Sequence, residues 1–155
     1  VEVVFAHRGT IDKFVGDMVM ALYGAPLDDP DHADHAVQTA LAMVRELEQL
    51  NRLWAVEGRA ALDIGIGINT GEMIAGNIGS DTIMSYTVIG DEVNIAARLT
   101  EQAIGGTVLA SVAVREAVGD LPGVRFGRAT RYRLKGIDPV SACVVSSETS
   151  PGGSA

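Results

Sequence analysis

The feature that most constrains the fold of this chain is a Gly16-Asp17 pair between two runs of strand-forming residues. Residues 10–15 are rich in β-branched and aromatic side chains, and the apolar run 18–23 follows the pair directly. Two such runs separated by two turn residues are typical of a β-hairpin, and Gly16 can take the positive φ that the first turn position needs. The pattern therefore predicts an antiparallel hairpin with Asp17 at its tip.

A carboxylate at such a tip has two interpretations. A rigidly held Asp17 suits Mg²⁺, which takes one or two protein carboxylates and fills its remaining positions with water and substrate phosphates. Acidic residues are also common in turns for conformational reasons alone. The turn by itself leaves both interpretations open and favours the conformational one.

A second informative stretch is residues 89–98, where Ile-Gly-Asp-Glu-Val-Asn-Ile-Ala-Ala-Arg predicts the end of a strand followed by a helix. A helix would place Asn94 and Arg98 on one face, about 6 Å apart. Arg98 lies between Ala97 and Leu99, where a guanidinium needs an anionic partner or an exit to water. The pair suits a polar, anionic substrate, although a solvent-facing pair on an amphipathic helix gives the same pattern.

The size and charge of the chain limit the classes of function. Its 155 residues, 47% of them apolar, fit one domain, which we place at residues 1–146, with a polar, disordered tail at 147–155. A net charge of −8 argues against a nucleic-acid partner, which requires a basic face. No apolar run reaches the roughly 20 residues that cross a bilayer, and no signal peptide is visible. We therefore expect a cytoplasmic location without direct membrane insertion.

Residues 31–56 carry apolar residues at helical spacing, which predicts a long helix with one face on a sheet. We expect Trp54 to fill a core or an interface. The Asp-His-Ala-Asp-His run at 31–35 could suggest a metal site. Its aspartates are better explained by the start of the helix after Pro30, where carboxylates favour the positive end of the helix dipole.

The rest of the chain predicts short alternating elements. Residues 1–8 resemble the end of a helix that stops at Gly9. Cys143 lies in an apolar, strand-like run, so we expect a buried, inert thiol. The remaining predictions are strands at 62–68 and 107–111, a strand or hairpin arm at 71–79, a helix at 112–118, and a terminal pair of strands at 124–134 and 141–145.

Four motifs in this order resemble class III adenylyl cyclases. They are Thr-Ile-Asp-Lys-Phe-Val-Gly-Asp at 10–17, Tyr-Gly-Ala-Pro at 23–26, Thr-Val-Ile-Gly-Asp-Glu-Val-Asn-Ile-Ala-Ala-Arg at 87–98 and Leu-Lys-Gly at 134–136. A co-linear set is far more specific than any one motif. The resemblance implies an α+β fold with a ferredoxin-like, palm-like core, in which helices cover the outer face of a mixed, mostly antiparallel sheet.

The resemblance also implies an activity and its residues. Cyclases of this family convert ATP into 3′,5′-cyclic AMP and pyrophosphate with two divalent ions, Mg²⁺ or Mn²⁺, per active site. By position, Asp17 matches a metal ligand and Asn94 matches the residue that orients the ribose. Arg98 matches the residue that stabilises charge at the α-phosphate, and Lys135 resembles the lysine that holds the terminal phosphates.

Two further positions match the pair that selects the purine base. These are Lys13, four residues before Asp17, and Thr87, seven before Asn94. Guanylyl cyclases of the family usually have Glu and Cys there. A lysine donates to the ring nitrogen of adenine but would face an N–H of guanine, so the pair favours ATP. A Lys and Thr pair resembles class IIIb, which implies bicarbonate as a regulator.

The family builds each active site across a dimer interface, with metal carboxylates from one subunit and the other residues from its partner. The resemblance therefore implies a homodimer with shared sites and an inactive monomer. In the family a strand with the first metal aspartate, and then a helix, precede the hairpin. Neither is found before Thr10, so we expect the chain to start mid-domain. The alternative is a catalytically silent cyclase-like module that binds nucleotide or dimerises.

Overall fold

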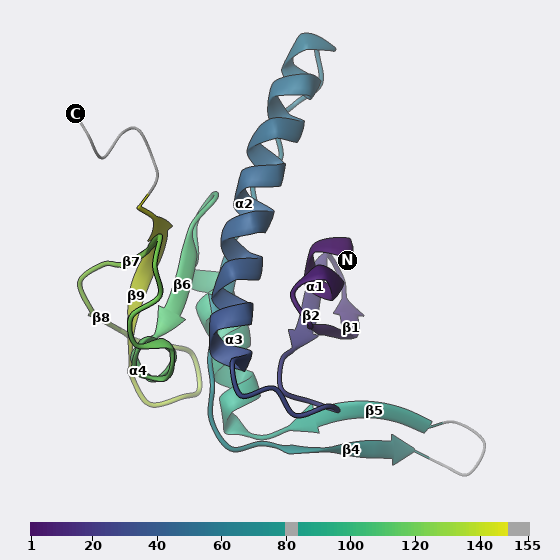
Figure 1. The fold of residues 1–155 in the computed structure, drawn as a ribbon, viewed down its shortest axis with the longest axis vertical. Coiled ribbons are helices and arrows are strands. Elements are labelled where there is room, and N and C mark those ends of the chain that lie inside the picture. Colours follow the sequence, from purple (N-terminus) through teal and green to yellow (C-terminus); the bar gives the residue numbers. More distant parts are fainter. Residues whose placement is uncertain (80–83, 149–155) are drawn as a thin grey trace.

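The computed structural model describes residues 1–79 and 84–148, with the backbone alone for 74–79 and 84–89. Figure 1 shows the long helix α2 standing between a small unit at the N-terminus and a sheet near the C-terminus. The elements are α1 (Glu2–Ala6), β1 (Thr10–Val15), β2 (Met18–Leu22), α2 (His32–Val56), β3 (Ile66–Ile68), β4 (Ile74–Gly79), β5 (Met84–Ile89), α3 (Asp91–Gln102), β6 (Val108–Ser111), α4 (Val112–Val118), β7 (Val124–Phe126), β8 (Thr130–Tyr132) and β9 (Val140–Ser147).

The main sheet is mixed and mostly antiparallel. Its strands follow the order β3-β6-β9-β7, and β8 also pairs with β9. Only the β3–β6 pair is parallel. Helices α2 and α4 pack on this sheet through an apolar core in which the central side chains are almost fully buried: Val37, Ala40, Leu41, Val108, Ala110, Val114 and Val145. The sequence prediction of a mixed sheet covered by helices is confirmed here.

Helix α3 packs on β3 without a layer of side chains between them. A Cβ placed on Gly67 would lie 2.4 Å from the backbone nitrogen of Thr100, and one on Gly65 would lie 2.1 Å from the carbonyl oxygen of Ala103. Ile66 and Ile68, which alternate with these glycines, pack against the core under α2. The two glycines therefore let the backbones of α3 and β3 approach closely, because any side chain there would hold them apart.

The hairpin forms as its sequence predicts. Strands β1 and β2 pair antiparallel with Val15 opposite Met18, and Gly16 has a φ of 59°. Helix α1 ends before the hairpin, and the amide of Gly9 bonds the carbonyl of Val4 at 2.8 Å. Helix α1 ends at Ala6 rather than at the predicted Arg8, and the left-handed residue after it is Arg8, with a φ of 66°, and not Gly9. Gly9 is required for a different, steric reason, since a Cβ there would lie 2.6 Å from both Tyr23 and Val4.

The sheet differs from the sequence prediction at three points. The strand expected at 62–68 begins only at Ile66, because the Asn51 side chain bonds both the amide and the carbonyl of Leu62. The strand expected at 124–134 is two strands, β7 and β8, which pair with opposite ends of β9. The expected single sheet is divided, because β1–β2 and β4–β5 each form a separate two-stranded ribbon.

Helices α2 and α4 begin and end within one residue of their predicted limits, and α3 follows β5 as the pattern of residues 89–98 predicts and continues to Gln102. Strand β9 is longer than the expected 141–145 and continues through Ser147, and the amide of Glu148 then bonds the carbonyl of Gly123 at 3.0 Å. The expected tail at 147–155 therefore starts inside β9, and its residues 149–155 lie outside the described residues. None of the described helices is long and apolar enough to cross a bilayer.

Candidate functional site

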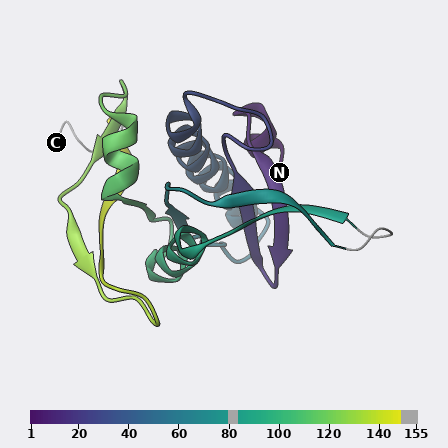
Figure 2. The same ribbon diagram turned by 90° about the horizontal axis from the view of Figure 1, so that it is seen from below.

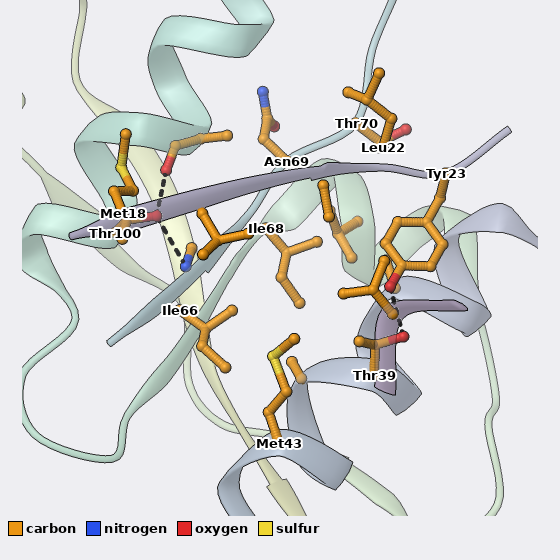
Figure 3. A pocket seen from close by; sticks show the side chains of 18 of the residues that line it. Met18, Leu22, Tyr23, Thr39, Met43, Ile66, Ile68, Asn69, Thr70 and Thr100 are labelled. Carbon is orange, nitrogen blue, oxygen red and sulfur yellow. Dashed lines mark hydrogen bonds between the residues drawn. The ribbon is translucent and has the colours of Figure 1, made fainter. Parts of the chain in front are cut away.

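Asp17 is exposed at the tip of the hairpin, as its sequence context predicts. It lines a cavity of about 810 Å³ that opens between β2, α2 and β3. Figure 3 shows the interior of this cavity, where apolar side chains from all three elements converge. Those that it labels are Met18, Leu22, Met43, Ile66 and Ile68. The cavity is therefore apolar inside, with the Asp17 carboxylate among its lining groups.

Polar contacts connect the hairpin end of the cavity to α2. The hydroxyl of Tyr23 donates to Thr39 Oγ1 at 2.6 Å, and Thr39 donates in turn to the carbonyl oxygen of His35 at 2.7 Å. His35 Nδ1 is also hydrogen-bonded to the buried carboxylate of Asp29. Burial raises the pKa of Tyr23 above its ordinary value, and the bond from His35 lowers the pKa of Asp29.

These contacts also decide between the two interpretations of the Asp-His-Ala-Asp-His run. Helix α2 begins at His32 with Asp31 as its N-cap residue, and Asp34 lies in the first turn. The described residues contain no group of three His, Cys, Asp or Glu side chains that could hold an ion. The run is therefore the start of a helix, and its His35 fixes the loop before α2 by bonding Asp29.

Helix α3 carries Asn94 and Arg98 on consecutive turns, as predicted. Asn94 is exposed, and Arg98 is about one-third exposed. The guanidinium of Arg98 donates to both carboxylate oxygens of Glu101, at 3.0 and 3.1 Å. The sequence predicts an anionic partner or an exit to water for this guanidinium, and the structure shows both, because Glu101 on the same helix accepts from it and its side chain is partly exposed.

Lys135 is exposed in the turn between β8 and β9, next to the buried Leu134. Leu134 packs in one apolar cluster with Leu99 of α3 and Ala142 of β9. The cluster fixes the segment that carries Lys135 against the helix that carries Arg98. Since Leu99 directly follows Arg98, the sequence neighbours of both basic residues meet in this cluster.

The base-selecting pair lies on two different ribbons. Lys13 is on β1 with its side chain about half exposed, and its ammonium lies 3.7 Å from the carboxylate of Asp12. Thr87 is on β5 opposite Gly76, and its side chain lies outside the described part of the structure. Of the predicted site residues whose side chains the structure describes, Asp17 lines the cavity, whereas Lys13, Asn94, Arg98 and Lys135 are not among its lining residues.

One polar group was missed by the sequence reasoning. Asn69, which follows β3, bonds Glu92 in the first turn of α3 and Ser111 at the end of β6. The only sequence signal near Asn69 was the set of glycines at 65, 67 and 71. They do not match a dinucleotide-binding fingerprint, and their spacing instead reflects close packing of β3 and its following loop against α3.

The carboxylate chemistry of the site fits a divalent ion only in part. Asp17 offers one exposed carboxylate on a rigid turn, which suits an ion that also binds substrate phosphates and water. Within the residues that the structure describes, no three His, Cys, Asp or Glu side chains gather into a group that could hold an ion. Asp17 is therefore the residue of this chain that would hold such an ion.

A family model and individual relatives both match this chain to the same family of proteins. The model of the Adenylate and Guanylate cyclase catalytic domain matches residues 6–147. Adenylate cyclase 1 of Rhizobium meliloti (strain 1021) is 39% identical over 137 residues, which cover 87% of this chain and 20% of that protein. An uncharacterised protein of Mycobacterium tuberculosis is 35% identical over 140 residues, covering 89% of this chain and 24% of that protein. The chain spans about a quarter or less of the length of these relatives.

Solved structures agree with this match. The guanylyl cyclase Cya2 superposes with a TM-score of 0.86 at 37% identity, covering 97% of this chain and 76% of Cya2. The adenylyl cyclase CyaB from P. aeruginosa also gives a TM-score of 0.86, at 35% identity, covering 95% of this chain and 76% of CyaB. The predicted α+β cyclase fold is therefore confirmed.

Proposed function

Because the chain belongs to the class III adenylate and guanylate cyclase catalytic domain family, we propose that it carries the ATP-cyclising site of an adenylyl cyclase. In this reaction the ribose 3′-oxygen of ATP attacks the α-phosphorus. The bond from that phosphorus to its bridging oxygen breaks, pyrophosphate leaves, and the hydroxyl proton passes to solvent or to a base. The products are 3′,5′-cyclic AMP and pyrophosphate.

Each of the residues that match the family's motifs has a proposed role that its position supports. Asn94 orients the ribose, and Arg98, one turn later on α3, stabilises the charge that develops at the α-phosphate. Lys135 binds the terminal phosphates from the β8–β9 turn. Asp17 would supply one carboxylate to the divalent ions, which when bound would lower the pKa of the 3′-hydroxyl and neutralise phosphate charge.

The Arg98–Glu101 pair is compatible with this role. The guanidinium presents several N–H donors in a fixed plane, and the bonds to Glu101 that the structure records come from one terminal nitrogen. The side chain is also about one-third exposed, which leaves part of the guanidinium accessible to a phosphate. Glu101 would then hold Arg98 in position while its other donors face the substrate.

Lys13 carries the proposal for ATP over GTP. Its side chain is about half exposed on β1, four residues before the metal-binding tip, and an ammonium can donate to the ring nitrogen of adenine. Among the relatives, the printed names include both an adenylyl and a guanylyl cyclase at similar identity. The choice of base therefore depends on individual residues of this chain and not on overall likeness.

We also propose that the working unit is a homodimer with shared sites. Asp17 lines the cavity beside the hairpin, whereas Asn94, Arg98 and Lys135 lie on α3 and on the β8–β9 turn. A twofold pair could bring the Asp17 of one chain to the Asn94 and Arg98 of the other. Bicarbonate stimulation is a further part of the proposal that rests on the Lys13 and Thr87 pair alone.

The test measures cyclic nucleotide formation from ATP and from GTP with Mn²⁺, on this chain and on a longer version extended to the length of the matching solved cyclases, of which the match covers 76%. We expect cyclic AMP from ATP and at least tenfold less cyclic GMP from GTP. In the Lys13→Glu variant the preference should move toward GTP, because a carboxylate accepts from the N–H groups of guanine. An unchanged preference in that variant would refute the role of Lys13.

A nucleotide-binding assay distinguishes an active cyclase from the alternative, a catalytically silent module that binds nucleotide. ATP binding without cyclic product in the longer version would mean that the domain binds but does not cyclise.

The matched control for Lys13→Glu is Arg128→Glu, which makes the same kind of charge reversal at an exposed basic residue outside the cavity lining. This variant should keep the preference for ATP.

A further inference from the structure

One amide side chain connects three elements around the proposed site. Asn69 Nδ2 donates to the backbone carbonyl of Glu92 at 2.9 Å and to the Glu92 carboxylate at 2.6 Å. Asn69 Oδ1 accepts from Ser111 Oγ at 2.7 Å, and Ser111 Oγ accepts from the amide of Val114 at 3.4 Å. Asn69 therefore links the end of β3 to the first turn of α3 and to the junction of β6 and α4.

The position of Glu92 is restricted by the backbone as well. A Cβ placed on Gly71 would lie 2.6 Å from Glu92 Cγ, so the Glu92 side chain lies directly against the loop after β3. Its carboxylate is thus held between this loop and the amide of Asn69. Such a contact leaves the first turn of α3 little freedom to shift relative to β3.

A second polar link joins α3 to β3 about two turns further along the helix. The amide of Gly67 donates to Thr100 Oγ1 at 3.1 Å, and Thr100 donates to the carbonyl of Ala96 at 2.9 Å. Asn94 and Arg98 lie on α3 between Glu92 and Thr100. The two links therefore bracket both proposed substrate-contacting residues. Figure 3 labels Asn69 and Thr100, one from each link, which both line the cavity.

We infer that Asn69 is a positioning residue for cyclisation, which fixes the first turn of α3 and thereby places Asn94 against the ribose. This inference rests on the proposed function. An amide suits the position because it donates to the two Glu92 oxygens and accepts from Ser111 at the same time. No carboxylate or aliphatic side chain of similar size can do both. Shifts of about 1 Å in a positioned group can cost roughly 100-fold in rate.

The decisive variants interchange the amide of Asn69 and the carboxylate of Glu92. Asn69→Asp has nearly the same shape but places a second carboxylate against Glu92, so the link becomes repulsive. Adding Glu92→Gln restores a donor and an acceptor, because the new amide can donate to the new carboxylate. We expect kcat to fall at least tenfold in Asn69→Asp and to recover at least threefold in the double variant, while KM for ATP changes less than threefold.

Asn51→Asp is the matched control. Asn51 also bridges backbone groups through its side-chain amide, at Leu62, but it lies on α2 away from α3. It should lower the thermal unfolding temperature without lowering kcat per folded molecule. A role of Asn69 in stability alone predicts the same behaviour for Asn69→Asp, and that result would overturn the inference.

Hydrogen exchange tests the inference independently of turnover. The Asn69→Asp variant should exchange the amides of residues 95 and 96, which bond back to the first turn of α3, at least tenfold faster than the unmodified chain. The amides of α4 and β9 should be unaffected. Unchanged exchange in the first turn of α3 would overturn the inference even if the cyclase proposal holds. If the amides of residues 95 and 96 exchange faster in Asn69→Asp but the unmodified protein forms no cyclic product, the result would instead contradict the proposed function alone.

Discussion

The two sides of helix α2 are held by different kinds of interaction. On the sheet side, residues such as Val37, Val108 and Val114 have 0–2% of their surface exposed and pack without polar groups between them. The hairpin side borders the cavity, and its recorded side-chain bonds to α2 run through Tyr23 and Thr39. Figure 2 shows the hairpin and the sheet on opposite sides of α2.

The hairpin also exposes more apolar surface than the sheet. Phe14 is 62% exposed and Val19 47% exposed, and within the described chain β2 pairs with β1 alone. The proposed site draws Asp17 and Lys13 from this side and Asn94, Arg98 and Lys135 from the sheet side. The comparison therefore teaches that the two halves of the site have unequal support, and that the residues on α3 are held more rigidly than the carboxylate.

The largest expected effect concerns the joining of the two halves. Arg98→Ala and Asp17→Ala should each lower cyclic AMP formation by at least about 100-fold, the usual loss for a group that stabilises transition-state charge. Neither should unfold the protein, because both side chains are exposed or partly exposed. Activity is measured on each variant and on an equal mixture of the two after refolding together.

The mixture distinguishes shared sites from sites within one chain. If each site takes Asp17 from one chain and Arg98 from its partner, mixed dimers carry one intact site, and about a quarter of the full activity should return. Activity that stays at the level of the single variants would rule out the shared arrangement. The unmixed variants refolded alone serve as the control.

A smaller effect tests the rigidity of the sheet side. Leu99 is fully buried and joins α3 to the segment of Leu134 and Ala142. Leu99→Ala should lower the free energy of unfolding by about 3 kcal/mol, through lost burial and the cavity that remains. Urea denaturation measures this change. Leu53→Ala, at a residue 64% exposed, should change it by less than about 0.5 kcal/mol.

A loss below about 1 kcal/mol in Leu99→Ala would mean that the sheet side is no better packed than the hairpin side. The comparison between the two sides of α2 would then fail.

The smallest effect tests the polar attachment of the hairpin. Tyr23→Phe removes the donor to Thr39 but keeps the ring, so the free energy of unfolding should fall by about 1 kcal/mol. Tyr132→Phe is the matched control, because the structure records no hydrogen bond from that hydroxyl among the described residues. Equal losses in the two variants would show that the Tyr23–Thr39 bond does not fasten the hairpin.

Much of the local structure could be predicted from sequence. The hairpin around Gly16, the limits of α2 and α4 and the presence of α3 follow from turn residues and apolar spacing within a few positions of each element. The strand at 62–68 was wrong in its first half because a side chain 11 positions away, Asn51, takes the backbone groups of Leu62. No local pattern reports such a contact.

The candidate site divides in the same way. Asp17 and the Asn94–Arg98 pair were singled out because a turn and a helical spacing mark them within a few residues, and their roles are proposals that come from the family resemblance. Asn69 was missed because its partners lie 23 and 42 positions away in the chain. Its own neighbours in sequence indicated only close packing.

The sequence by itself determined the separate elements, the family of the chain and the residues that match the family's motifs. Those features depend on steric and hydrogen-bonding preferences between near neighbours, which are the same wherever the segment lies. Only the tertiary structure decided that β3 pairs with β6, that Asn51 bonds the backbone of Leu62 and that Asn69 bonds Glu92 of α3. These contacts form when packing brings particular side chains together, and packing depends on the volumes and polar groups of the whole chain at once.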